Sequence, residues 1–146
     1  MSRKTDPLVL DAFPLLVLFG RQRGWEVSKE YLDLPLQTGI PHLLSSVNFG
    51  EVLYVLQRDH GERAAETARQ RILEGTIEIV LPTLEQTYLA ARLKSYGGAS
   101  YADCYAAALA LERDLAVLTG DMEFQKLEPR GVRVEWLPAN RGAASN

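Results

Sequence analysis

The sequence predicts a single α/β domain: a parallel sheet of about four to five strands, flanked by helices on both faces. Short runs that are apolar throughout alternate with longer helical patterns, as in sheets buried on both sides. The 146 residues suit one hydrophobic core, and we find no internal repeat, low-complexity tract or linker. We therefore predict one domain over residues 1–138, followed by a flexible tail over residues 139–146.

Composition and charge narrow the functional class. Hydrophobic residues make up 47% of the chain, yet no apolar run reaches the ~20 residues that a membrane span needs. We interpret residues 1–19 as a strand and a helix, not a signal peptide, because Asp11 and Pro14 interrupt the apolar stretch. The single cysteine, Cys104, excludes an internal disulfide and suits a reducing compartment. We expect a cytoplasmic protein that does not enter a membrane, with Cys104 buried in the core.

The net charge of −3 disfavours bulk attraction to nucleic acid, because phosphate affinity comes from Lys and Arg. A function on RNA would need a local mechanism, such as metal ions held by clustered acids. Arg21, Arg23, Arg58 and Lys94 are candidates for positioning RNA, but isolated charges of this kind are more typical of a solvated surface, so we assign them no role.

The first part of the chain predicts a buried strand at residues 8–10 and a helix at 13–23. Regular structure is interrupted over residues 24–41, where Ser28 is a candidate cap for a short helix that Pro35 ends. No further element is predicted before residue 48.

The middle of the chain has clearer periodicity. From Phe49, apolar residues recur at i, i+3, i+4 and i+7, which predicts a helix over residues 48–59. A second, more polar helix follows at 62–74. The β-rich stretch at 77–81 predicts the next strand.

Two capping pairs mark later helix starts: Thr83 with Gln86, and Ser100 with Asp103. The helices that they open run to about residues 95 and 113. The remaining predicted elements are a strand at 116–118, a short helix ending near 127 and a last strand at 132–136.

Acidic residues follow two of these strands directly. Asp11 and Asp121 each end an apolar run, so both belong at the carboxyl edge of the sheet, where α/β domains bind ligands. An Asp between a strand and a helix is also a common N-cap, and either residue alone is explained better in that way.

Two helix starts carry further acids. Asn48 and Glu51 lie beside the apolar stripe of their helix, either lining a site or serving as cap and dipole partner. Asp103 precedes a face of small side chains, which favours close packing and burial of its carboxylate. No Lys or Arg follows Asp103 at i+3 or i+4, so that carboxylate needs another cation. Together the four acids predict a site for Mg²⁺ or Mn²⁺ rather than zinc, because their ligand atoms are all oxygen.

The same stretches resemble a known family. VLDAF (9–13), SSVNFGEVLYVL (45–56), SYADCYAAALALERD (100–114) and AVLTGDMEF (116–124) resemble the PIN domain, and more narrowly the VapC toxins of toxin–antitoxin pairs. The resemblance runs from about residue 8 to 136. Over residues 25–41 the sequence departs from the family pattern, because VapC toxins often carry longer helices there that contact antitoxins.

The resemblance implies a ribonuclease with a metal-binding acidic quartet, Asp11, Glu51, Asp103 and Asp121. Asn48 and Thr119 match positions that support such a site by hydrogen bonding. Glu123 is a candidate outer acid, but it is more typical of a solvated helix residue. The implied cofactor is Mg²⁺ or Mn²⁺, and the implied partners are an RNA substrate, a cognate antitoxin protein and a second copy in a homodimer.

We therefore expect phosphodiester hydrolysis by metal-activated water, with Asp11 as the most central ligand and single-stranded or looped RNA as substrate. One alternative is a catalytically inactive PIN-like module that binds RNA or protein. An aspartyl phosphatase usually has a second acid two residues after the first, but position 13 is Phe. A receiver domain needs a lysine late in the sheet, and we do not find one. His42 and His60 are expected in loops and are too few for a zinc site or a triad.

Overall fold

A computed structural model describes residues 6–138, so the predicted tail at 139–146 lies outside the described residues. Five parallel strands form one sheet in the order β3-β2-β1-β4-β5, which confirms the predicted sheet. The strands are β1 (Val9–Leu10), β2 (Leu43–Ser45), β3 (Glu78–Val80), β4 (Val117–Thr119) and β5 (Val134–Trp136). No helix in the described part of the chain is long and apolar enough to cross a membrane.

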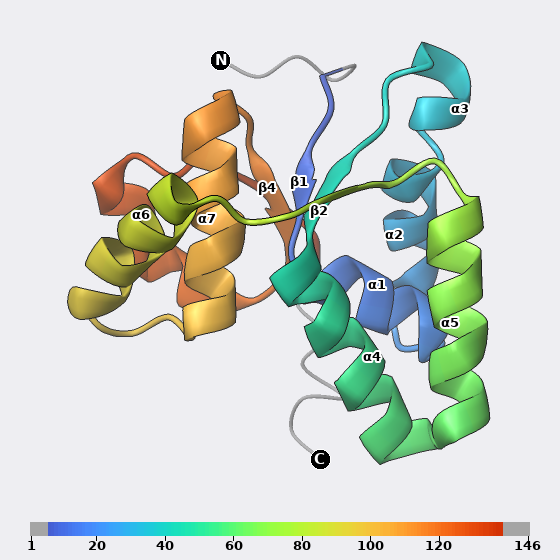
Figure 1. Ribbon diagram of the computed structural model, residues 1–146. Coiled ribbons are helices and arrows are strands. Elements are labelled where there is room, and N and C mark those ends of the chain that lie inside the picture. Colours follow the sequence, from blue (N-terminus) through green and yellow to red (C-terminus); the bar gives the residue numbers. More distant parts are fainter. Residues whose placement is uncertain (1–5, 139–146) are drawn as a thin grey trace.

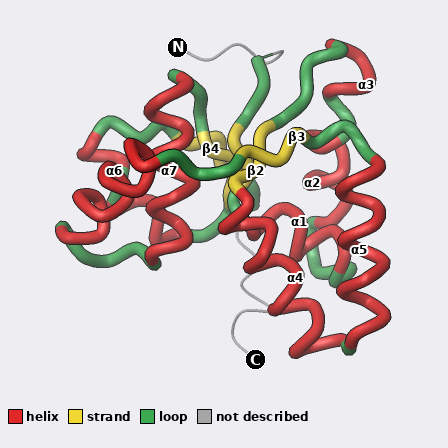
Figure 2. Tube along the Cα trace, in the orientation of Figure 1, coloured by secondary structure: helices red, strands yellow, loops and turns green. Residues whose placement is uncertain are grey.

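Helices cover both faces of this sheet, as predicted (Figure 1). They are α1 (Ala12–Phe19), α2 (Trp25–Leu32), α3 (Pro35–Thr38), α4 (Ser46–His60), α5 (Glu62–Glu74), α6 (Leu84–Ser95) and α7 (Tyr101–Arg113), with the 3₁₀ helices η1 (Met122–Lys126) and η2 (Glu128–Arg130). Figure 2 shows α6 and α7 on one side of the strands, and α1, α2, α4 and α5 on the other.

Two hydrophobic clusters fill the two interfaces. One packs the alanine-rich α7, with α6 and η1, against one face of the sheet, and Cys104 is fully buried in it as expected. The other packs α1, α4 and α5 against the opposite face. Small side chains on α7, including Ala106, Ala107 and Ala110, let that helix lie close to the strands.

The order of the strands creates a switch point. From β1 the chain moves to β2 and then β3 on one side, and it later returns to β4 and β5 on the other side of β1. The connections after β1 and β4 therefore leave the sheet from neighbouring strands and diverge. In such folds this crevice, beyond the carboxyl ends of the strands, is where ligands bind.

The stretch between residues 13 and 41 differs from the prediction. Helix α1 ends at Phe19 instead of residue 23, because Arg21 adopts a left-handed conformation with φ of 50° that a helix cannot continue through. Ser28 does not cap a helix: it is buried inside α2, which starts after Gly24 with φ of 88°. Pro35 opens the short α3 rather than ending a helix.

Strand β2 was not predicted. It is only three residues long, and α4 begins at the next residue, so no turn signal separates the two elements. Its position between β1 and β3 nevertheless makes it a central strand of the sheet.

Candidate metal centre

Asp11 leaves β1 at the switch point and caps α1. One carboxylate oxygen accepts a hydrogen bond from the backbone N–H of Phe13, and the other accepts one from the Thr119 hydroxyl at 2.8 Å. The side chain is buried, with 2% of the residue exposed. The capping role and the placement at the sheet edge are therefore compatible, because the cap itself fixes the carboxylate at the crevice.

Thr119 ends β4 and connects two of the predicted acids. Its hydroxyl donates to Asp11 and accepts from the backbone N–H of Asp121 at 3.0 Å. Asp121 in turn caps η1, accepting from the N–H of Glu123 at 3.0 Å. A single buried hydroxyl thus fixes the relative positions of Asp11 and Asp121.

Gly120, between them, has a packing reason to lack a side chain. A Cβ atom there would lie 2.5 Å from the ring of Phe13, which is closer than packed carbon atoms approach. The Phe13 ring therefore packs directly on the turn that carries Asp121. This contact holds the start of α1 against the end of β4.

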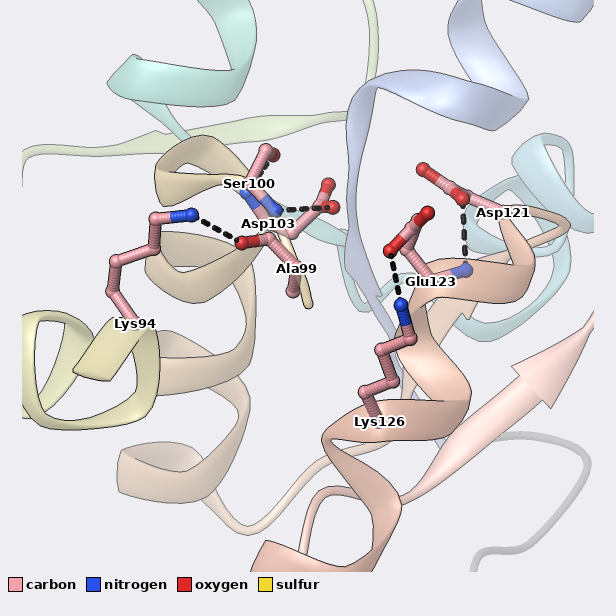
Figure 3. Close-up of polar contacts among 7 residues, drawn as sticks. All are labelled: Lys94, Ala99, Ser100, Asp103, Asp121, Glu123 and Lys126. Carbon is pink, nitrogen blue, oxygen red and sulfur yellow. Dashed lines mark hydrogen bonds and ion pairs between the residues drawn. The ribbon is translucent and has the colours of Figure 1, made fainter. Parts of the chain in front are cut away.

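Asp103 belongs to the capping box predicted at the start of α7. The Ser100 hydroxyl accepts from the N–H of Asp103 at 3.1 Å, and the Asp103 carboxylate accepts from the N–H of Ser100 at 3.2 Å. Asp103 is only 5% exposed, so this helix start buries its acid at the crevice (Figure 3).

The start of α4 differs from the expectation for Asn48 and Glu51. Ser45 is the N-cap of that helix, so Asn48 does not cap it and Glu51 lies beyond the first turn. Asn48 is fully buried, and its amide donates to the carbonyl of Ala102 at 3.1 Å, which ties α4 to the first turn of α7. Its side-chain oxygen has no hydrogen-bond partner among the described residues.

The fold brings the predicted acids to one place. Carboxylate oxygens of Asp11, Asp103 and Asp121 lie within 4.8 Å of one another. Glu51 lines a pocket with Asp103 and Asp121, and Glu123 lies on the rim of the same pocket. Within residues 6–138, no Lys or Arg forms an ion pair with Asp11, Glu51, Asp103 or Asp121.

Burial and mutual repulsion raise the pKa values of three of these carboxyl groups. Burial, followed by the charge of Asp103, raises the pKa of Asp11 well above its ordinary range. Burial, with the charge of Asp121, raises the pKa of Asp103 to about 6. Burial also raises the pKa of Glu51; a hydrogen bond from Asn48 opposes that shift, and the charge of Asp121 adds to it. The site therefore disfavours its own negative charge.

This donor set fits a hard divalent cation. Carboxylates supply only oxygen ligands, which Mg²⁺ and Mn²⁺ prefer and which do not favour zinc. The partnerless side-chain oxygen of Asn48 adds an unsatisfied acceptor beside the same helix starts. A bound cation would offset the repulsion between the carboxylates, which contributes to their raised pKa values. We conclude that the residues present suit a divalent metal ion.

The other residues considered from the sequence lie in different surroundings. His42 is in a loop, as expected, but is buried, whereas His60 is the last residue of α4 rather than part of a loop. Arg21 stacks on Trp25, and Arg58 pairs with the exposed Asp59. Lys94, to which we assigned no role, lines the acidic pocket. Only the packing of α6 beside α7 shows this, because the separation of nine positions between Lys94 and Asp103 exceeds any local helical spacing.

Comparison with known proteins places this geometry in context. A family model described as PIN domain matches residues 8–128. A comparison with curated protein sequences found no match.

Solved structures with the same fold include toxins and toxin–antitoxin complexes. VapC20 of Mycobacterium tuberculosis, described as a sarcin-ricin loop cleaving toxin, has a TM-score of 0.69 and 16% identity, covering 88% of this chain and 98% of that chain. VapBC2 of Rickettsia felis, bound to a promoter DNA fragment, has a TM-score of 0.70 and 14% identity, covering 88% and 96%. VapBC-1 of nontypeable Haemophilus influenzae has a TM-score of 0.62 and 15% identity, covering 87% and 95%.

Proposed function

The chain belongs to the PIN domain family, and on that premise we propose that it is a metal-dependent endoribonuclease, the toxin of a VapBC-type toxin–antitoxin pair. The observation that carries the proposal is the set of three carboxylates, from Asp11, Asp103 and Asp121, within 4.8 Å of one another and without an ion-pair partner in the described part of the chain. Such a set is costly to a folded protein unless a cation binds to it.

The residues that would hold the ion are Asp11, Asp103 and Asp121, with Glu51 across the pocket. Mg²⁺ or Mn²⁺ bound there would supply an activated water and neutralise the charge of the scissile phosphate. Thr119 would keep Asp11 and Asp121 in register, through the two hydrogen bonds of its hydroxyl. Asn48 would hold Glu51 and the first turn of α7 together.

The proposed partners are an RNA substrate, a cognate antitoxin and a second copy of the chain. The fold similarity to toxin–antitoxin complexes supports the antitoxin. An apolar groove away from the acids, lined by residues that include Leu15, Trp25 and Leu32, offers a surface for a protein partner. The homodimer follows from the resemblance to VapC toxins alone.

The test is a titration of Mg²⁺ and Mn²⁺ into wild type and the D103N variant, following thermal unfolding and cleavage of a mixed RNA pool. Asn keeps an oxygen to accept from Ser100, so the capping box survives while one charge is lost. We expect metal to raise the unfolding temperature of wild type by several degrees and to release RNA cleavage, with both effects strongly reduced in D103N.

The matched control is D59N, which removes an exposed acid that pairs with Arg58 outside the site. It should respond to metal as wild type does. Wild type that neither gains stability nor cuts RNA with metal would contradict the proposal. Metal-dependent stabilisation and RNA binding without cleavage would instead support a catalytically inactive module.

A further inference from the structure

The acidic pocket also contains a positively charged side chain, on the side formed by α6. Lys94 lines the pocket, and its ammonium donates to the carbonyl of Ala99 at 2.9 Å, directly before the start of α7 (Figure 3). Among the described residues, Lys94 forms no ion pair with a carboxylate. An ammonium has three donors, so this contact holds the group in place and leaves two donors for a ligand.

A second pocket adjoins the acidic one and shares Gly98 with it. Its lining residues are Tyr96, Gly97, Gly98, Lys126, Pro129 and Arg130. The guanidinium carbon of Arg130 lies 3.5 Å from the centre of the Tyr96 ring, which is itself 47% exposed. A guanidinium stacked on an aromatic ring presents a flat, cationic surface of the kind on which nucleic-acid bases stack.

Gly98 allows a third cation to lie between the two pockets. Its φ is 98°, and a Cβ atom there would lie 2.1 Å from Cδ of Lys126, so the Lys126 side chain packs directly on the glycine backbone. The Lys126 ammonium lies 3.3 Å from the Glu123 carboxylate on the rim of the acidic pocket. This ion pair is exposed and therefore weak, so a phosphate can compete for the ammonium.

We propose that Lys94, Lys126 and the stacked pair Tyr96–Arg130 form a binding site for one nucleotide of single-stranded RNA next to the bond that is cut. The base would stack on the Tyr96–Arg130 pair, and the flanking phosphates would bind Lys94 and Lys126. The inference rests on the proposed ribonuclease function and names how its substrate is held.

The net charge of the chain and the positions of the two lysines both favour binding of the RNA at these residues. The chain carries a net charge of −3, so a phosphate approaching the acids needs local cations to bind at all. Lys94 lies on the α6 side of the carboxylates and Lys126 on the η1 side, as Figure 3 shows. A base can stack on Arg130 only if it has left a duplex, which selects single-stranded or looped RNA.

The experiment measures binding of a fluorescein-labelled ten-nucleotide RNA of mixed sequence, with Mg²⁺ present, in the D103N background so that the RNA stays intact. In that background we add Lys94→Gln, Arg130→Gln, Tyr96→Leu or Tyr96→Phe. Lys94→Gln should weaken binding roughly fivefold to tenfold and reduce the slope of log K against log [salt] by about 0.7, the value for one lost phosphate contact. Tyr96→Leu should weaken binding roughly tenfold with little change in the salt slope, whereas Tyr96→Phe should retain binding.

A matched control exists on α6, the helix that carries Lys94. Arg92 lies over the ring of Tyr88 at 5.8 Å, in an exposed pair that lines neither pocket. Arg92→Gln and Tyr88→Leu should leave binding within about twofold of the D103N parent, whereas Arg130→Gln should weaken it roughly tenfold. All the substituted side chains are exposed, and thermal unfolding checks that each variant is folded.

The outcomes separate this inference from the proposed function. Wild type that cuts RNA, together with Lys94, Tyr96 and Arg130 variants that bind as tightly as their parent, would overturn the nucleotide site alone. Wild type that fails to cut RNA, together with variants that lose binding as described, would support the nucleotide site and contradict the nuclease. Equal losses in the Arg92 and Arg130 variants would also overturn the site, because they would indicate only general charge attraction.

Discussion

One buried titratable side chain lies at each end of the parallel strands, and the two differ in how their hydrogen bonds and charges are satisfied. His42 lies just before β2 and is 1% exposed, whereas Asp11 lies just after β1 and is 2% exposed. The His42 ring accepts from the backbone N–H of Leu8 at 3.0 Å, and its other nitrogen lies 2.8 Å from the carbonyl of Tyr31. A neutral ring with one protonated nitrogen satisfies both contacts, and burial lowers the pKa of His42, which favours that neutral form.

Asp11 is also hydrogen-bonded, but its charge is not satisfied. Asp103 and Asp121 stand close to it, and burial with the charge of Asp103 raises its pKa. A buried polar group whose partners all come from the chain is explained by folding alone. A buried cluster whose like charges repel indicates a missing external partner. The comparison separates a structural histidine from a candidate metal centre.

The largest effect on stability should come from the histidine end. His42→Leu would leave the Leu8 N–H without a partner and remove the ring contact to the Tyr31 carbonyl, which would keep only its backbone hydrogen bond from Leu34 at 3.2 Å. These losses should lower the free energy of unfolding by about 2–4 kcal/mol. RNA cleavage per folded molecule should not change. Urea unfolding and a cleavage assay below the unfolding transition measure the two quantities.

The control for this change is His60→Gln at the end of α4, which should alter stability by no more than about 0.5 kcal/mol. A His42→Leu protein that is fully folded but inactive would break the comparison, because it would give the histidine end a part in the reaction.

The next effect concerns the hydroxyl that connects two acids. Thr119→Val keeps the shape of the side chain but removes both hydrogen bonds, to Asp11 and from Asp121. We expect metal affinity to fall by about 10- to 100-fold, as for other groups that orient metal ligands. Thr119→Ser keeps the hydroxyl and should retain most of the affinity. Isothermal titration with Mn²⁺ measures both, and equal affinity in the Val and Ser variants would contradict this role.

The smallest effect is the pH dependence, which should have opposite signs at the two ends. The pKa of Asp103 is raised to about 6, so its contribution to stability is present below the unfolded value of 3.8 and is lost as pH rises through 6. The pKa of His42 is lowered, so its contribution is present above 6.5 and is lost as pH falls through its folded value.

Metal-free wild type should therefore lose on the order of 2 kcal/mol, relative to D103N, between pH 4.5 and pH 7.5. Urea unfolding at these two pH values, with chelator present, gives the difference. Saturating Mg²⁺ at pH 7.5 should restore the lost stability in wild type only. A wild type and D103N that respond identically to pH would show that Asp103 carries no unfavourable charge.

Local sequence predicted those elements whose signals are local. The helix at 62–74 was predicted with the observed bounds, and Ser100 with Asp103 forms the capping box that the spacing indicated. Strand β2 was missed because two leucines and a serine give no periodicity and α4 begins at the next residue, with no turn between them. Local sequence offered a capping role for Asn48. Its contact with the Ala102 carbonyl could not be predicted in this way, because it joins residues 54 positions apart.

The sequence by itself determined the alternation of strands and helices and the position of Asp11, Asp103 and Asp121 at the start or end of an element. These features depend on apolar periodicity and on hydrogen bonds between near neighbours in the chain. Only the tertiary structure decided which acids share one pocket and which cations stand beside them. Asp11 meets Thr119 across 108 positions, and Lys94 reaches the pocket only because α6 packs on α7. Charge repulsion and burial act through space, so the pKa values of the site arise only when the sheet has assembled.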